Sequence, residues 1–224
     1  MKTTKQPKPL LDSDFDAKQL PGFEQLILAW VKLHRRYLCA FDPQICETSF
    51  GYRERSQVSL LGTAAFLCNG VALQEWALAK KGSKRLGRND LWLQLKERGR
   101  DHEYLVEAKH DWIGLENPPD KRLQKLIKSA TKSAYKISSK HKSQKLTRLG
   151  LALGSITFPS KSLDDADMAR SKFISKLKKS WSKHKIQGWA AIWVNASEFF
   201  KGPRLDKHTA IGLVMLVKSL DGHY

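Results

Sequence analysis

The chain has 224 residues and carries 40 lysine and arginine residues against 22 acidic ones, which gives a formal net charge of +18. Hydrophobic residues make up 41% of the chain and aromatic residues 9%. A wholly disordered basic tail is much poorer in both, so this class is excluded. The large positive charge favours a polyanionic partner, with nucleic acid as the first candidate and an anionic membrane surface as the second.

Cysteine content and apolar runs indicate the compartment. Cys39, Cys46 and Cys68 are too few for a disulfide framework and form no C-x-x-C pair, so we expect reduced thiols. The first 20 residues contain lysines but no apolar segment after them, which is unlike a secretory signal. The longest apolar run, 210–217, is shorter than the ~20 residues that cross a bilayer. The sequence therefore predicts a cytoplasmic protein without a membrane partner.

Hydrophobic periodicity predicts helices and then a meander in the first half of the chain. Residues 1–20 are polar and predict a flexible basic arm. Apolar residues at helical spacing predict a helix over 23–38 and a second helical stretch over 52–76, which Asn69-Gly70 kinks or splits. Alternating residues between turn signals then predict three short antiparallel strands over 76–79, 91–95 and 104–108.

The second half of the chain alternates between helices and strands. A helix over 121–138 is followed by a strand over 149–158 and by a helix that ends near residue 184. Two further strands, 189–194 and 209–217, complete the pattern. Because no repeat and no clean linker interrupts residues 21–224, we predict one α/β domain over this range.

Acidic residues and a lysine fall together in the predicted meander. Asp90 opens the second strand, and Glu107-Ala108-Lys109 ends the third. Because side chains alternate along a strand, Glu107 and Lys109 share a face, and a neighbouring strand can bring Asp90 beside them. Glu75 falls at the end of the helix predicted before the meander. Two or three carboxylates at a sheet edge can hold a hard divalent cation such as Mg²⁺, which supports phosphoryl chemistry.

These residues resemble the motif of the PD-(D/E)xK nuclease superfamily, whose fold is called restriction-endonuclease-like. The matching pieces are Glu75, residues 87–93 around Asp90, and residues 104–109 with their acid-x-lysine triplet. The family core is α-β-β-β-α-β, a mixed central sheet flanked by helices. The predicted elements follow this order from about residue 60 to 158, with an added N-terminal helix and added C-terminal strands. Asn89 stands where the family motif has proline, a residue that members of the family often lack.

The resemblance implies a Mg²⁺- or Mn²⁺-dependent nuclease that hydrolyses DNA phosphodiester bonds, in bacterial or mobile-element defence or in repair. Asp90 and Glu107 would bind the metal together with the backbone carbonyl of Ala108. Lys109 would activate water, and Glu75 would assist the metal or the water. The alternatives are a non-catalytic nucleic-acid-binding protein on the same fold, or a nuclease that acts on RNA or branched DNA.

Two further residues are accessory candidates. Glu54 could reach the metal, or it could be a helix-start acid that interacts with the helix dipole. Gln124 corresponds to a glutamine that an exonuclease-like branch of the superfamily uses, or it could be a surface residue. A second acid-x-lysine triplet, Asp16-Ala17-Lys18, lies in the predicted arm without a strand before it, and we interpret it as a chance match.

Basic residues gather in two places that could face phosphates. Lysines follow steps of four and three along one side of the helix predicted over 121–138, and no acid lies between residues 121 and 142. A second group crowds the turn before Asp90. The predicted nucleic-acid contacts are Lys81, Lys84, Arg85, Arg88, Lys121, Lys125, Lys128, Lys132 and Lys136. Whether the chain forms a homodimer or joins a partner protein of a defence or repair system is left open.

Overall fold

A computed structural model describes residues 9–40, 48–79, 86–115, 119–136, 146–159, 165–194 and 208–220. The elements in chain order are β1 (Leu10–Phe15), α1 (Phe23–Ala40), η2 (Ser49–Gly51), α2 (Glu54–Leu67), β2 (Val71–Ala79), β3 (Leu86–Glu97), β4 (Arg100–Gly114), α3 (Pro119–Tyr135), β5 (Leu146–Pro159), α4 (Ala166–His184), β6 (Gly188–Trp193) and β7 (His208–Ser219).

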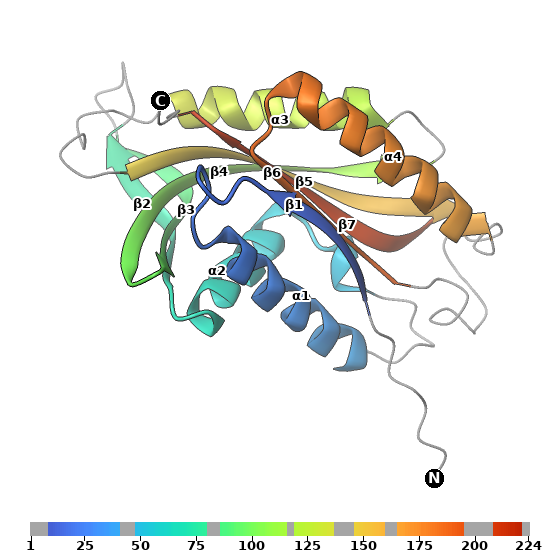
Figure 1. Ribbon diagram of the computed structural model, residues 1–224, viewed down its shortest axis with the longest axis horizontal. Coiled ribbons are helices and arrows are strands. Elements are labelled where there is room, and N and C mark those ends of the chain that lie inside the picture. The colour runs from blue at the N-terminus through green and yellow to red at the C-terminus, as the bar shows by residue number, and fades with distance from the viewer. Residues whose placement is uncertain are drawn as a thin grey trace, which may run out of the picture.

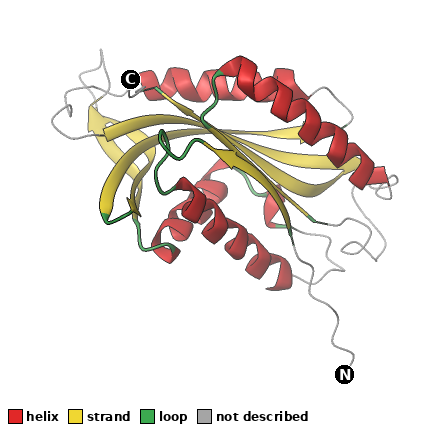
Figure 2. Cartoon of the chain, viewed as in Figure 1, coloured by secondary structure: helices red, strands yellow, loops and turns green. Residues whose placement is uncertain are grey.

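A seven-stranded mixed sheet in the order β1-β6-β7-β5-β4-β3-β2 forms the centre of the fold. Helices α1 and α2 cover one face of the sheet and α3 and α4 cover the other (Figures 1 and 2). β2, β3 and β4 form the antiparallel meander that the sequence predicts, and β5 joins β4 in parallel. The prediction of an α/β fold with a mixed sheet between helices is therefore confirmed.

The middle of β5 is buried on both of its faces, as a central strand between two helical layers requires. Its residues from Leu149 to Ser155 are all buried, and this run is the apolar segment that predicted a strand. Helix α3 approaches the sheet closely at Gly150, where a Cβ atom would lie 2.7 Å from the backbone nitrogen of Thr131. The glycine therefore sets the distance between α3 and the strands that carry the candidate site.

The helical stretch predicted over 52–76 ends earlier than expected. The N–H of Gly70 donates to the carbonyl of Ala65 at 2.8 Å, and the N–H of Asn69 donates to the carbonyl of Phe66 at 3.2 Å. Asn69 adopts a left-handed conformation with φ of 61°. These features are a Schellman C-cap, which satisfies carbonyls that the helix leaves open. The chain then enters β2, and the prediction of helix beyond residue 67 is wrong.

The prediction of a flexible arm over residues 1–20 is wrong for residues 10–15, which form β1. This strand pairs antiparallel with β6 at the edge of the sheet. Asp12 also accepts a hydrogen bond from Arg170 of α4 at 2.7 Å. An edge strand with polar residues on its outer side carries a weak hydrophobic pattern, and this explains why the sequence did not reveal it. Among the helices that the structure describes, none is long and apolar enough to cross a membrane.

Candidate functional site

The site lies where β3 and β4 separate. Pairing of the two strands runs from Glu97 and Arg100 as far as Leu91 and Val106. One residue further along, the carboxylate of Asp90 accepts a hydrogen bond from the backbone N–H of Ala108 at 2.7 Å. The Asp90 side chain thus takes the place of a backbone carbonyl of β3 as the acceptor for this N–H. The main chain of Ala108, including its carbonyl, is in this way turned toward the gap between the two strands.

Lys109 brings a positive charge into this gap. Its ammonium group donates a hydrogen bond to the carbonyl of Ala108. The same nitrogen lies 3.9 Å from a carboxylate oxygen of Asp90 and 3.9 Å from a carboxylate oxygen of Glu54. Oxygens from β3, β4 and α2 therefore surround one cationic group, which is about one-third exposed.

Glu54 joins the site from the first turn of α2. One of its carboxylate oxygens accepts a hydrogen bond from the backbone N–H of His110 at 3.1 Å. Partial burial raises the pKa of Glu54, and the nearby Asp90 carboxylate raises it further, while Lys109 acts in the opposite direction. Glu54 is thus both a helix-start acid and a member of the group around Lys109, so the two interpretations of this residue are compatible.

His110 supports the site from the opposite face of β4. Its Nε2 atom lies 2.7 Å from Oγ of Ser155 on β5, and that hydroxyl donates to the carbonyl of Phe50 in η2. Because a serine hydroxyl has one proton, His110 must donate to it through Nε2. Burial lowers the pKa of His110. The sequence pattern did not indicate this network, which ties β4, β5 and η2 together beneath Lys109.

Glu107 precedes the Ala108–Lys109 pair and is 4% exposed. Side-chain alternation places it on the same face of β4 as Lys109 and Asp111. Asp111 forms an ion pair at 3.3 Å with Arg122 of α3, so this face of β4 is the one that α3 covers. Glu107 is therefore a buried carboxylate on the α3 side of β4.

Glu75 differs most from its predicted position. It lies on β2, not on a helix, and the register places it opposite Asp90, because its neighbours pair with Leu91 and Asn89. Its backbone is left-handed, with φ of 50°. Its carboxylate forms ion pairs with Arg88 at 2.7 Å and with Arg55 at 3.6 Å. Glu75 is therefore held by two arginines at the exposed edge of the site.

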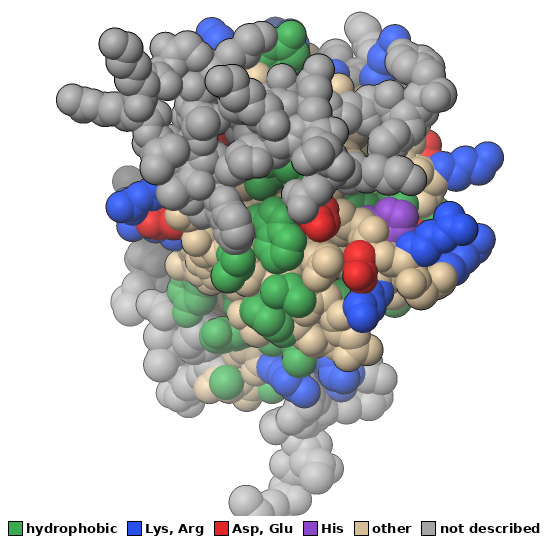
Figure 3. Space-filling model, turned by 90° about the vertical axis from the view of Figure 1, so that its left-hand side faces the viewer, with side chains coloured by type: hydrophobic (Ala, Val, Ile, Leu, Met, Phe, Trp, Pro, Cys, Tyr) green, Lys and Arg blue, Asp and Glu red, His purple; other side chains and the backbone are tan. Residues whose placement is uncertain are grey.

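The predicted basic contacts occupy different surroundings. The five lysines of the predicted stripe lie on α3 or directly after it and are exposed. Arg88 is exposed and paired with Glu75. The face seen in Figure 3, toward the β2 end of the sheet, shows acidic side chains with lysine and arginine side chains nearby. Lys81, Lys84 and Arg85 fall outside the described residues.

Two other sequence candidates lie away from the site. Gln124 lines a groove on the side of α3 that faces β7, whereas Arg122 contacts β4. The triplet that starts at Asp16 directly follows β1, so a strand does precede it. Its Asp16 carboxylate accepts hydrogen bonds from the backbone of Lys18 at 3.0 Å and from the side chain of Gln19 at 2.8 Å, and thereby closes a turn.

The donor atoms around Lys109 are chemically suited to a hard cation. Two carboxylates and a backbone carbonyl are the oxygen ligands that Mg²⁺ takes, with waters and phosphate oxygens completing its shell. In the part of the chain that the structure describes, no three His, Cys, Asp or Glu side chains form a metal-binding group. The arrangement is therefore a two-carboxylate set, which holds the ammonium group of Lys109.

Comparison of the chain with protein-family models, with curated proteins and with solved structures finds no match. The geometry of the residues around Lys109 is therefore the basis for assigning a function.

Proposed function

We propose that this chain is a metal-dependent nuclease that hydrolyses DNA phosphodiester bonds. One observation carries the proposal. Asp90, Glu54 and the carbonyl of Ala108 come from separate parts of the chain and converge on the ammonium group of Lys109. An exposed acid–lysine pair at a strand end would need neither of two features seen here. The first is the carboxylate of Asp90 bound to the N–H of Ala108, and the second is the carboxylate of Glu54 that α2 brings from the other face of the sheet.

The order of the elements supports a restriction-endonuclease-like core as the framework. The sequence α2-β2-β3-β4-α3-β5 matches the α-β-β-β-α-β order of that core. The acid-x-lysine triplet lies on the third of these strands, and Asp90 lies on the second. β1, α1, α4, β6 and β7 are additions around this core.

The oxygen ligands fit Mg²⁺ or Mn²⁺. Asp90 and the carbonyl of Ala108 would hold the ion together with one further carboxylate, either Glu107, as the sequence predicts, or Glu54. A bound divalent cation supplies positive charge and Lewis acidity beside the scissile phosphate. Arg88 and Arg55 neutralise Glu75, so this acid would shape the rim and keep two arginines near the substrate.

The chain's own residues would position the reactants. Lys109 carries three donors on a flexible stem, which can orient the attacking water and neutralise charge on the phosphate. Asp90 holds Ala108 and Lys109 in place through its hydrogen bond to the backbone of β4. One oxygen of Glu54 accepts the backbone N–H of His110 and the other lies 3.9 Å from Lys109, so Glu54 would help to hold this lysine in place.

The test is a time course of cleavage on linear, circular and single-stranded DNA with Mg²⁺, with Mn²⁺ and with EDTA. The purified chain is compared with Lys109→Ala and with Lys18→Ala, which changes the lysine of the other acid-x-lysine triplet. We expect cleavage that requires the cation, disappears in Lys109→Ala and persists in Lys18→Ala. Cleavage that survives in Lys109→Ala would contradict the assignment.

A non-catalytic nucleic-acid-binding protein is the second candidate, and one observation favours it. Glu75, the acid opposite Asp90 on β2, forms ion pairs with two arginines. A residue predicted to assist the metal or the water is therefore already neutralised, and this is compatible with a protein that only binds. A binding protein of this kind would leave all DNA intact in Mn²⁺, and EDTA would not change its affinity. Adding RNA and branched DNA to the same time course separates this candidate from a nuclease with another substrate.

A further inference from the structure

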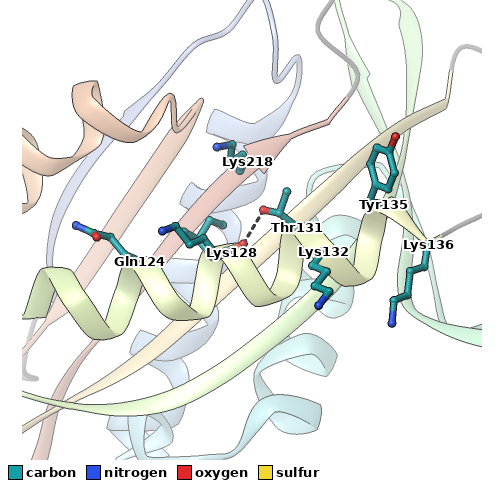
Figure 4. Close-up of a pocket in the computed structure, with 8 residues that line it drawn as sticks. Gln124, Lys128, Thr131, Lys132, Tyr135, Lys136 and Lys218 are labelled. Atoms are coloured by element: carbon teal, nitrogen blue, oxygen red, sulfur yellow. Dashed lines mark hydrogen bonds between the residues drawn. The ribbon is translucent and has the colours of Figure 1, made fainter.

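A groove of about 460 Å³ lies on the side of α3 that faces β7. Six of the residues that line it are Ile127, Lys128, Thr131, Tyr135, Lys136 and Lys218. Figure 4 shows Gln124, Lys128 and Thr131 on the side of the helix toward Lys218 of β7, whereas Lys132 and Lys136 extend to the other side. The lysines therefore continue from the groove across α3.

Glu107 of β4 and Lys218 in the groove lie on the two strands that flank β5, and α3 packs on β5. Glu107 pairs with Gly150 of β5, and Gly150 pairs with Lys218 of β7. Two strand spacings of ~4.8 Å place the backbones of Glu107 and Lys218 about 10 Å apart. α3 lies over Gly150, between them. A polymer chain bound near Glu107 would have to pass over α3 to reach the groove.

The lining of the groove combines apolar and cationic groups. Ile127 lines the groove and is 3% exposed, while Tyr135 is 60% exposed. The guanidinium carbon of Arg148 lies 5.9 Å from the centroid of that ring. None of the described residues that line the groove is acidic. The groove therefore offers a surface for flat apolar groups, with lysine ammonium groups around it.

We propose that this groove binds a single-stranded nucleic-acid segment that continues from the scissile phosphate. A base would stack on Tyr135, and Lys128 and Lys218 would contact the adjacent phosphates. Proteins that bind single strands combine a basic groove with aromatic rings in this way. The groove as a single-strand site stands on its own residues, whereas its continuity with the scissile phosphate rests on the proposed nuclease function.

The size and the chemistry of the groove favour a single strand over a duplex. A volume of about 460 Å³ is that of a site for a small molecule, which means a few unpaired nucleotides. In a duplex the base faces are stacked on one another, so they are not accessible to an aromatic ring. An exposed tyrosine adds little to duplex binding, but it contributes strongly when bases are unpaired.

The binding experiment uses fluorescence anisotropy of labelled oligothymidylate and of a blunt duplex of equal length, in EDTA so that no cleavage occurs. Tyr135→Ala is compared with Tyr135→Phe, which keeps the ring. Lys128→Ala/Lys218→Ala is compared with Lys18→Ala/Lys32→Ala, which removes the same charge from exposed lysines in the turn before α1 and on α1. Thermal unfolding verifies that each variant is folded.

Loss of stacking on an aromatic ring costs ~1–3 kcal/mol per base, so Tyr135→Ala should weaken oligothymidylate binding about 5- to 150-fold. Tyr135→Phe should bind normally, and Tyr135→Ala should change duplex binding less than twofold. The groove double variant should weaken single-strand binding more than the control double variant. Unchanged oligothymidylate binding in folded Tyr135→Ala, or equal losses on both DNA forms, would overturn the proposal.

Two further arms separate this proposal from its rivals. Vesicles with anionic lipid should bind wild-type and groove variants alike, and a defect confined to vesicles would refute the nucleic-acid assignment. With Mg²⁺, cleavage of a duplex with a single-stranded overhang should fall in Tyr135→Ala, while blunt-duplex cleavage should not. If the wild type cleaves neither duplex, both the nuclease function and the path from the scissile phosphate to the groove are refuted. The anisotropy data in EDTA then decide alone whether the groove binds single strands.

Discussion

At the residue scale, Asp90 has two roles that a substitution can separate. Its carboxylate accepts the N–H of Ala108 at 2.7 Å, and it also lies beside Lys109. Asparagine keeps an oxygen that can accept the N–H but removes the charge, whereas alanine removes both. The structural role and the proposed chemical role of this side chain therefore make different predictions.

We expect Asp90→Ala to lower the free energy of unfolding by ~1–3 kcal/mol, because it leaves the N–H of Ala108 without its partner. Asp90→Asn should keep most of that stability, yet both variants should lose DNA cleavage. Urea denaturation and the cleavage time course measure the two effects. A stability loss in Asp90→Asn as large as that in Asp90→Ala would mean that the charge, and not the hydrogen bond, holds β4.

A second residue-scale prediction concerns His34 of α1, which is fully buried. Its Nδ1 atom lies 2.7 Å from Oγ of Ser49, and burial lowers the pKa of His34 to about 3. Below the ordinary histidine pKa of ~6.5, the unfolded chain takes up this proton and the folded chain does not. Stability from this group is therefore present near neutral pH and is lost as the pH falls from 6.5 toward 3.

The expected loss at pH 4.5 is ~2–3 kcal/mol, which follows from 1.36 kcal/mol for each pH unit below the pKa of the unfolded chain. Carboxylates titrate in the same range, so the measurement is the difference between wild type and His34→Gln in urea denaturation at several pH values. The variant should lose less stability than the wild type between pH 7 and 4.5. Parallel curves for the two proteins would show that His34 does not titrate on unfolding.

At the element scale, Gly150 determines how closely α3 packs on β5. A Cβ atom there would lie 2.7 Å from the nitrogen and 2.9 Å from the Cα atom of Thr131, so the helix backbone itself must shift. We expect Gly150→Ala to cost ~1–3 kcal/mol, as overpacking in a core does. The matched control is Gly51→Ala, whose Cβ would make only ordinary contacts of 3.5 Å or more. Similar melting temperatures for the two variants would contradict this view of α3.

The elements also show what the sequence could predict. Alternation and apolar runs are strong in buried strands such as β5, so their positions were predicted to within a few residues. The apolar residues around Glu75 fit the spacing of a helix as well as that of a strand, so the sequence predicts a helix there. In the structure, the C-cap at Asn69 ends α2 before Glu75. Side-chain alternation placed Lys109 on the face of Glu107, but only tertiary packing brings Glu54 to Lys109.

The same limit applies to the groove on α3. The sequence shows its lysines as a stripe, but no sequence pattern singles out Tyr135. Lys218 is remote in sequence and enters the groove only because β7 pairs with β5. A local pattern therefore indicates the lysines that α3 contributes to the groove, while the order of strands in the sheet determines the position of Lys218.

At the scale of the whole molecule, the net charge is +18, and the described residues show where part of it lies. The α3 layer carries the lysine stripe and the groove, and the carboxylates of Asp90 and Glu54 lie at the opening between β3 and β4. α3 thus has a basic outer surface beside a small acidic site. Repulsion between phosphates and these acids is expected to be offset by the surrounding lysines.

The salt dependence of binding tests this arrangement. On duplex DNA each neutralised phosphate adds ~0.9 to the slope of log affinity against log salt. Lys121 and Lys125 are exposed on α3 and are not among the residues that line the groove, so they are suited to contact a duplex that approaches the site.

Lys121→Ala/Lys125→Ala should reduce the slope by up to ~1.8, because two phosphate contacts are lost. Lys18→Ala/Lys32→Ala, with the same net charge, should retain the wild-type slope. Anisotropy titrations in EDTA over a range of salt concentrations measure both, and equal slopes for the two double variants would show that net charge, and not the surface of α3, governs duplex binding.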